Sequence, residues 1–207
     1  MIAIIDYGAG NLQSVVKAFR YIGTDCIVTN EKEKILNSEG AVLPGVGAFG
    51  NAMESLHNSG AFDAVTEYIS TGKPFLGICL GLQLLFDHSE ESPDVNGMGI
   101  LKGSISKIPD LGGTLKIPHM GWNSLNIRRH DGLYNGIEGQ PYVYFVHSYF
   151  LKADDSDIVS AQTEYGTTID ASVQSGNIYA TQFHPEKSGK VGLQILKNFI
   201  NITRGEN

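Results

Sequence analysis

The stretch from Phe75 to Phe86 reads FLGICLGLQLLF and holds Cys79 in a Gly-x-Cys-x-Gly pattern between two apolar runs. This predicts a strand, a sharp turn and a helix, the layout of a nucleophile elbow, whose strained backbone pushes the reactive side chain toward substrate. The amino-terminal end of the following helix favours a thiolate and offers the N–H of Leu80 to an oxyanion. Taken alone, the turn is equally compatible with a cysteine buried in the core.

The segments before this turn alternate between strand and helix patterns. Strands are expected at residues 2–6, 26–29, 41–44 and 74–78. Between the first two strands, helical spacing places apolar residues on one face at Leu12, Val15, Val16 and Phe19, and a later helical stretch does so at Phe62, Val65 and Ile69. Apolar strands without polar alternation are typical of a parallel sheet covered on both faces.

After about residue 100 the pattern changes to successive strands with hairpin signals. These strand segments span residues 100–108, 115–125, 142–150, 158–165, 171–174 and 178–183. A final amphipathic helix carries Val191, Ile195, Leu196, Phe199 and Ile200. The expected fold is therefore α/β, with a mixed, largely parallel central sheet flanked by helices and antiparallel strands in the second half, in a single domain over residues 1–207.

Composition narrows the class of protein. A formal net charge of -7 argues against a nucleic-acid partner, because no basic cluster offsets it. Neither a basic leader nor an apolar run of membrane-spanning length is visible, so we expect no membrane association and a cytoplasmic location. The only cysteines, Cys26 and Cys79, are then expected to be free thiols, with Cys26 buried and inert in an apolar strand.

A base and its orienting carboxylate are found far downstream, in the segment YATQFHPEK at residues 179–187. A thiol nucleophile needs an imidazole to carry protons, and the imidazole needs a carboxylate to fix its orientation and tautomer. His184 and Glu186 are two residues apart at a strand end, so both can lie on one side of the chain. These two ligands are too few for a metal site, and the sequence has neither HxxxH nor CxxC spacing.

The other histidines divide into two groups. His57, His88 and His130 lie in polar stretches and are expected at the surface. His119 and His147 lie in strand-like segments, where a structural or supporting role is expected.

A glycine-rich loop, PGVGAFG at residues 44–50, follows the third predicted strand. Acyl transfer needs main-chain N–H groups beside the nucleophile, and Gly45, Val46 and Gly47 can supply them. By itself the loop also fits an ordinary strand-to-helix turn.

In this order, PGVG, GICLG and FHPE resemble the class I (triad) glutamine amidotransferases, over nearly the whole chain. More narrowly, five segments resemble the glutaminase subunits of imidazole glycerol phosphate synthase: IDYGAGN at 5–11, PGVGAFG at 44–50, HMGWN at 119–123, YFVHSY at 144–149 and FHPEKS at 183–188. The resemblance implies that Cys79 is the nucleophile, His184 the general acid and base, and Glu186 the orienting carboxylate. It also implies that the substrate glutamine is held by Gln83 and by the main chain around Ser148 and Tyr149. No cofactor is implied.

The resemblance further implies a heterodimer with a separate (β/α)8-barrel cyclase subunit. That subunit receives ammonia through a channel and converts the ribulosyl-formimino nucleotide PRFAR to imidazole glycerol phosphate and AICAR. A barrel needs about 250 residues, so this chain of 207 residues is too short to contain one. The implied interface includes Asn11 in the stretch Tyr7–Asn11, Trp122 in HMGWN, and Lys187.

Two alternatives stay open at this point. One is a triad amidotransferase subunit that serves another acceptor, as in anthranilate or guanylate synthesis, although YFVHSY and HMGWN argue against it. The other is a regulatory subunit whose cysteine is idle, although the chain retains Cys, His and Glu together.

Overall fold

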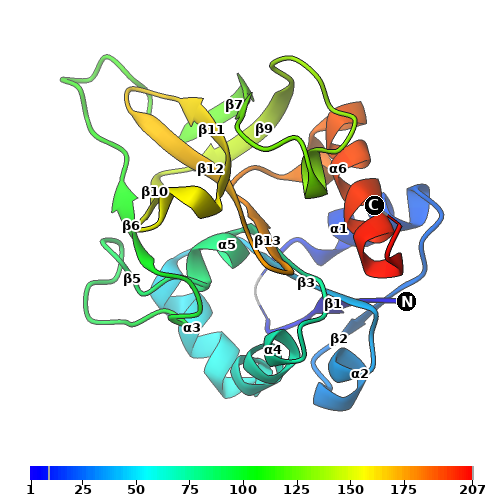
Figure 1. Cartoon of the computed structure of the whole chain (residues 1–207). Helices are drawn as coiled ribbons and strands as arrows, with labels where there is room; N and C mark the ends of the chain where they lie inside the picture. The colour runs from blue at the N-terminus through cyan, green and yellow to red at the C-terminus, as the bar shows by residue number, and fades with distance from the viewer. Residues whose placement is uncertain (9, 207) are drawn as a thin grey trace.

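A mixed sheet crosses the molecule, and helices cover it (Figure 1). The computed structural model describes residues 1–8 and 10–206, so Ala9 and Asn207 of the expected domain lie outside the described residues. In those ranges the main sheet has eleven strands, with the order β2 (Cys26–Thr29), β1 (Ile2–Ile5), β3 (Gly40–Gly45), β4 (Phe75–Cys79), β13 (Ile178–Thr181), β12 (Thr168–Ser175), β10 (Tyr149–Ala153), β6 (Gly103–Lys107) and β5 (His88–Ser89). Off this path, β11 (Val159–Glu164) pairs with β12, and β8 (Asn126–Ile127) pairs with β11.

The half of the sheet built from β2, β1, β3, β4 and β13 is parallel. Alternate residues of a strand face opposite sides, and both sides are covered here. Ile2 and Ile4 belong to one apolar core with residues of α1 (Leu12–Tyr21) and α6 (Gly189–Arg204). Ala3 and Ile5 belong to a second core with residues of α2 (Lys32–Leu36), α3 (Phe49–Asn58), α4 (Ala61–Ser70) and α5 (Leu80–Leu84). The predicted continuous apolar strands are explained by these two cores.

The strand β13 joins the two halves of the sheet. It pairs in parallel with β4, where Thr181 lies opposite Ile78. On its other side it pairs antiparallel with β12, and the remaining strands of that half are largely antiparallel. The carboxyl ends of β4 and β13 therefore meet at one edge of the sheet. The two segments that the sequence singled out, around Cys79 and His184, come directly after these ends.

The segment at residues 142–150, predicted to be one strand, is in fact two. β9 (Tyr142–His147) pairs with β7 (His119–Ser124) in a separate two-stranded sheet, visible at the top of Figure 1. After Ser148 the chain enters β10 and pairs with β6 in the main sheet. Periodicity cannot reveal this break, because the apolar pattern continues through it while the pairing partner changes.

The helices and the glycine-rich loop differ in part from the predictions. The glycine-rich loop is shorter than expected, because β3 continues through Gly45 and α3 already begins at Phe49. Neither α2 nor α3 was among the predicted helices, and three short 3-10 helices also occur: η1 (Gly132–Tyr134), η2 (Ser156–Ile158) and η3 (Pro185–Lys187). Throughout the two described ranges, no helix combines the length and the apolar character that a membrane crossing requires.

Candidate active site

Cys79 stands in a strained backbone conformation at the turn between β4 and α5. Its φ of 56° and ψ of -108° make it the one non-glycine residue with positive φ in the described part of the chain. A side chain other than glycine adopts such a geometry only when its surroundings enforce it, at a cost on the order of 1–3 kcal/mol. The predicted elbow is therefore present as a local structure, and strain of this kind is concentrated at functional sites.

Two glycines make this turn sterically possible. A Cβ atom on Gly81 would overlap the carbonyl oxygen of Leu43 on the neighbouring strand β3. A Cβ atom on Gly77 would lie 2.8 Å from the carbonyl oxygen of Gly81, closer than van der Waals contact allows. The Gly-x-Cys-x-Gly pattern thus serves close approach of the backbone on both sides of Cys79.

His184 and Glu186 form a buried pair at the end of β13. His184 Nδ1 lies 2.8 Å from Glu186 Oε1, and both side chains are almost fully buried. The loop is fixed by the Ser188 hydroxyl, which donates to the His184 carbonyl at 2.6 Å, and by the His184 N–H, which donates to the Tyr144 carbonyl at 3.0 Å. Within the described residues, His184 Nε2 has no hydrogen-bond partner. That nitrogen is left to exchange a proton.

Opposing effects set the protonation of His184. Burial lowers the pKa of its imidazole, but interaction with the Cys79 sulfur and the Glu186 carboxylate outweighs burial and raises the pKa from 6.5 to about 9. An imidazole held in this way beside a cysteine and a carboxylate is suited to exchange protons with a nucleophile.

A pocket of about 340 Å³ opens beside Cys79. It brings together most of the residues that the sequence analysis assigned to catalysis, oxyanion stabilisation and substrate binding: Val46, Gly47, Cys79, Leu80, Gln83, Ser148, Tyr149 and His184. Gly45 and Glu186 lie instead at a much smaller cavity, of about 10 Å³, which Asn11, Val46 and His184 also line. Val46 and His184 thus separate the pocket from a cavity that reaches toward Asn11.

Gln83 lines the pocket and also makes hydrogen bonds within the protein. Its side-chain Nε2 donates to the Tyr149 carbonyl at 3.0 Å and to Gln182 Oε1 at 2.9 Å, so both amide hydrogens are used within the protein. Gln182 in turn directs its Nε2 to the Cys79 sulfur at 3.8 Å. Sequence reasoning missed Gln182, because one glutamine in a strand-like run carries no signal that it faces a nucleophile.

Other pocket residues were also missed. Glu91, Pro118, Val146 and His147 line the pocket, and Glu91 Oε2 accepts a hydrogen bond from the N–H of Phe49 at 2.8 Å. A polar acidic loop is ordinarily solvated surface, so nothing in the sequence set Glu91 apart. His147 was expected to have a structural or supporting role, and its position in the pocket wall extends that interpretation.

The three predicted interface residues lie outside the pocket. Trp122 is 55% exposed, and its ring packs edge-on against Tyr144 at 6.3 Å. Lys187 extends over the same tyrosine, with Nζ 6.0 Å from the ring centre. Asn11 is exposed and precedes α1. In the predicted stretch Tyr7–Asn11, Ala9 lies outside the described residues, and the Tyr7 side chain is buried and cannot meet a partner.

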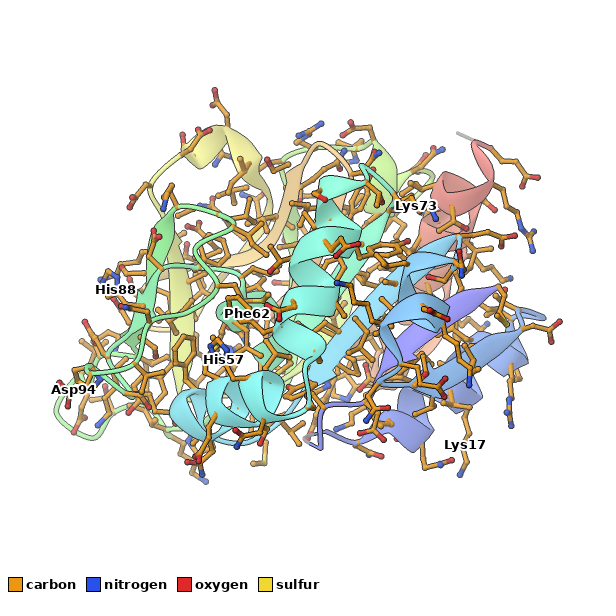
Figure 2. All side chains as sticks on the ribbon, turned by 90° about the horizontal axis from the view of Figure 1, so that it is seen from below. Lys17, His57, Phe62, Lys73, His88 and Asp94 are labelled. Atoms are coloured by element: carbon orange, nitrogen blue, oxygen red, sulfur yellow. The ribbon has the colours of Figure 1, made fainter. Side chains whose placement is uncertain are left out.

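The remaining candidates lie as follows. His57, His88 and His130 are exposed, as predicted, and His57 stacks on Phe62 with ring centres 4.2 Å apart (Figure 2). Cys26 is partly exposed rather than buried, because β2 is an edge strand of the sheet. In the described part of the chain no three His, Cys, Asp or Glu side chains are placed to hold a metal ion.

Three features together indicate the class of protein: a strained cysteine, a glycine-rich strand end and a buried His–Glu pair. Residues 3–202 match the family "Glutamine amidotransferase class-I", and the chain belongs to this family. The chain is 51% identical over 202 residues to imidazole glycerol phosphate synthase subunit HisH of Bacillus cereus, covering 98% of this chain and 95% of the relative. It is 50% identical over 204 residues to the HisH subunit of Methanothermobacter thermautotrophicus, covering 99% and 100%.

Solved structures show the same fold at low sequence identity. A structure described as a glutamine amidotransferase aligns with a TM-score of 0.76 and 16% identity, covering 99% of this chain and all of that one. The structure of PurLQS from Thermotoga maritima aligns with a TM-score of 0.72 and 20% identity, covering 97% of each chain. The predicted class I fold is thereby confirmed.

Proposed function

We propose that this chain is the glutaminase subunit of an imidazole glycerol phosphate synthase. As a single cytoplasmic domain it hydrolyses glutamine and passes the ammonia to a separate barrel cyclase subunit, which makes imidazole glycerol phosphate and AICAR from PRFAR. The observation that carries the proposal is the strained Cys79 in a 340 Å³ pocket that His184 also lines, with Glu186 hydrogen-bonded to His184 behind it. The identity to HisH subunits is the reason for proposing imidazole glycerol phosphate synthase in particular.

The reaction begins at the side-chain amide of glutamine. The Cys79 thiolate attacks the amide carbon, a C–S bond forms, and the carbonyl electrons move to the oxygen. Main-chain N–H groups of the Gly45–Gly47 segment and of Leu80 stabilise this oxyanion. His184 then gives its proton to the departing nitrogen, the C–N bond breaks, and ammonia and a thioester result.

Hydrolysis of the thioester completes the cycle. His184 takes a proton from water, the resulting hydroxide attacks the thioester carbon, and the C–S bond breaks to release glutamate and the Cys79 thiolate. Glu186 holds the imidazole in one orientation and stabilises it when charged. Glu91 in the pocket wall suits the ammonium group of an amino-acid substrate.

The glycine-rich segment also suits control of turnover. Val46 is 40% exposed, and Gly47 has a φ of 104° that other residues rarely adopt, so the backbone here is set by local glycine geometry. We expect the isolated chain to be a slow glutaminase, and the cyclase with bound nucleotide to raise kcat by selecting the state with an oxyanion donor in place. One such donor is worth on the order of 100-fold to 1000-fold in kcat.

A partner fits the side of the molecule near the small cavity. Asn11 lines that cavity together with His184 and Glu186, so ammonia released at His184 has a short way to the surface there. Trp122 and Lys187 flank Tyr144, whose carbonyl accepts the His184 N–H. We place the cyclase on this surface.

The test is a comparison of Cys79→Ala with Cys26→Ala as the matched control. In the complex with the cyclase, Cys79→Ala should abolish synthesis driven by glutamine while synthesis driven by added ammonia continues. Cys26→Ala should retain both activities. Equal loss of both activities in Cys79→Ala would instead indicate failed assembly, and a wild-type chain that hydrolyses no glutamine with its partner would contradict the proposed function.

A further inference from the structure

Two buried histidines, one of them in the pocket wall, form a continuous hydrogen-bonded chain. His119 Nδ1 lies 3.0 Å from His147 Nε2, and His147 Nδ1 lies 2.9 Å from the carbonyl oxygen of Tyr149. At the other end, Asn123 Nδ2 lies 3.3 Å from His119 Nε2. The chain of contacts therefore runs from β7 through both imidazoles to the pocket wall.

The two ends of this chain fix the direction of every hydrogen bond in it. The Tyr149 carbonyl can only accept, so His147 must carry its proton on Nδ1. Asn123 is oriented independently, because its Nδ2 also donates to the Glu164 carbonyl at 3.0 Å and its Oδ1 accepts from the Ser124 N–H at 2.8 Å. Its amide nitrogen can only donate, so His119 Nε2 accepts and His119 Nδ1 donates to His147 Nε2.

Both imidazoles are therefore neutral and carry the proton on Nδ1. An added proton on either ring would set two N–H donors against each other. Their surroundings agree with this state: burial lowers the pKa of His119 to about 4. Burial also lowers the pKa of His147, to about 3; it outweighs the opposing effect of the hydrogen bond to the Tyr149 carbonyl, and the nearby His184 acts in the same direction as burial. The ring of His119 is held between Phe145 and Tyr165, with centres 4.7 and 3.9 Å away.

The carbonyl at the end of the chain lies where the backbone leaves one sheet for the other. β9 ends at His147 and β10 begins at Tyr149, and the residues around this break line the pocket. The Tyr149 carbonyl accepts from both His147 Nδ1 and Gln83 Nε2, so both of its lone pairs are occupied and its plane is fixed. Position and orientation of the Ser148–Tyr149 backbone thus depend on the imidazole chain.

We infer that His119 and His147 are positioning residues, which orient the Ser148–Tyr149 main chain for glutamine binding and tie it to the exposed strand β7. This inference rests on the proposed function, because it takes the pocket as the glutamine site. β7 presents Met120 and Trp122 to solvent, 61% and 55% exposed, on either side of Gly121. A partner bound to that strand therefore has a rigid connection to the substrate pocket.

The first test is the tautomeric state of the rings. Nitrogen-15 NMR of the folded wild-type chain at pH 7 should show His119 and His147 as neutral imidazoles protonated on Nδ1. The signals are assigned with variants that each lack one histidine. This is the less common tautomer of a free imidazole, so a merely buried histidine would not produce it twice. An Nε2–H tautomer or an imidazolium at either position would overturn the inference.

The second test distinguishes loss of the hydrogen-bond donor at residue 119 from a mere change of side chain there. In His119→Asn the amide nitrogen occupies the place of Nδ1 and still donates to His147, whereas His119→Leu removes the donor and leaves His147 Nε2 buried without one. In the complex with the cyclase, His119→Leu should raise the KM for glutamine about tenfold with kcat changed less than about threefold, and His119→Asn should stay near wild type.

Ammonia-driven synthesis by His119→Leu should equal that of the wild type, which shows that the complex has assembled. An unchanged KM in His119→Leu, equal damage in both variants, or a loss confined to kcat would overturn the positioning role. If His119→Leu fails to fold, the tautomer measurement still decides. Absence of glutamine hydrolysis by the wild-type complex would contradict the proposed function instead, whatever the tautomers are.

Discussion

His184 is the residue whose chemistry depends most on its neighbours. Alone and buried it would be neutral at pH 7, because desolvation disfavours the imidazolium. The interaction with Cys79 and Glu186 reverses this and raises its pKa to about 9. The same three side chains thus determine both the proposed reactivity and a pH-dependent part of the stability.

A pH series of unfolding measurements checks this balance. The pKa of His184 in the folded chain lies above its ordinary value of 6.5, so the folded state binds the proton more tightly than the unfolded state. Its contribution to the free energy of unfolding is then complete below pH 6.5 and is lost as the pH rises to about 9. Urea unfolding should show the advantage of wild type over His184→Gln shrinking across this interval. The exposed His57→Gln serves as control, and a constant or growing advantage would contradict the raised pKa.

At the scale of elements, the position of Cys79 depends on how closely α5 approaches β3. A helix of five residues contributes little stability by itself, since isolated short helices are marginal in water. What holds α5 is its packing: Leu80, Leu82 and Leu84 are buried in the core shared with α3 and α4. Gly81 allows this packing because it has no side chain facing Leu43.

Replacing Gly81 by alanine tests the close approach. Helix propensity favours alanine by about 1 kcal/mol, but overpacking against backbone costs roughly 1–3 kcal/mol, and the carbonyl of Leu43 cannot rotate away within its strand. We expect Gly81→Ala to be less stable in thermal unfolding and to lose glutaminase activity, since Cys79 is displaced with α5. Gly23→Ala, whose added Cβ meets open space at φ 78°, should keep its activity. Full activity in Gly81→Ala would show that the turn at Cys79 tolerates a wider separation between α5 and β3.

At the scale of the whole molecule, the two-stranded sheet β7–β9 stands apart from the main sheet and carries its own exposed apolar side chains. Tyr21, an exposed aromatic residue at the end of α1, is not among the residues that line the candidate active site. Aromatic residues are enriched at the centres of protein interfaces. Under the proposed function we therefore expect the cyclase partner to contact the exposed face of β7.

Binding of the cyclase measures this expectation. Trp122→Ala should weaken the complex by about 2 kcal/mol, or roughly 30-fold in Kd, as is typical of an aromatic hot spot. Tyr21→Ala, which removes an aromatic side chain that is 79% exposed, should leave Kd unchanged. Titration calorimetry with the purified cyclase gives both values. Identical affinities for wild type and Trp122→Ala would move the interface away from β7.

The sequence by itself determined the local features of this protein. The parallel strands, α1, α4 and α6 were predictable because their apolar periodicity follows from burial on one face or both. The elbow was predictable because glycines on both sides of a cysteine, between a strand and a helix, have a steric meaning within a few residues. The spacing of His184 and Glu186 belongs to the same local class, and their hydrogen bond needs only the short 3-10 turn that Pro185 begins.

Only the tertiary structure decided which distant segments meet. Gln182 contacts the Cys79 sulfur across 103 positions because β13 inserts between β4 and β12, and strand order is not encoded in the period of any single strand. The break at Ser148, the imidazole chain behind it and the place of Glu91 in the pocket likewise depend on which strand or loop lies alongside. Periodicity records whether a residue is buried, whereas the identity of its neighbours is fixed by the packing of the whole chain.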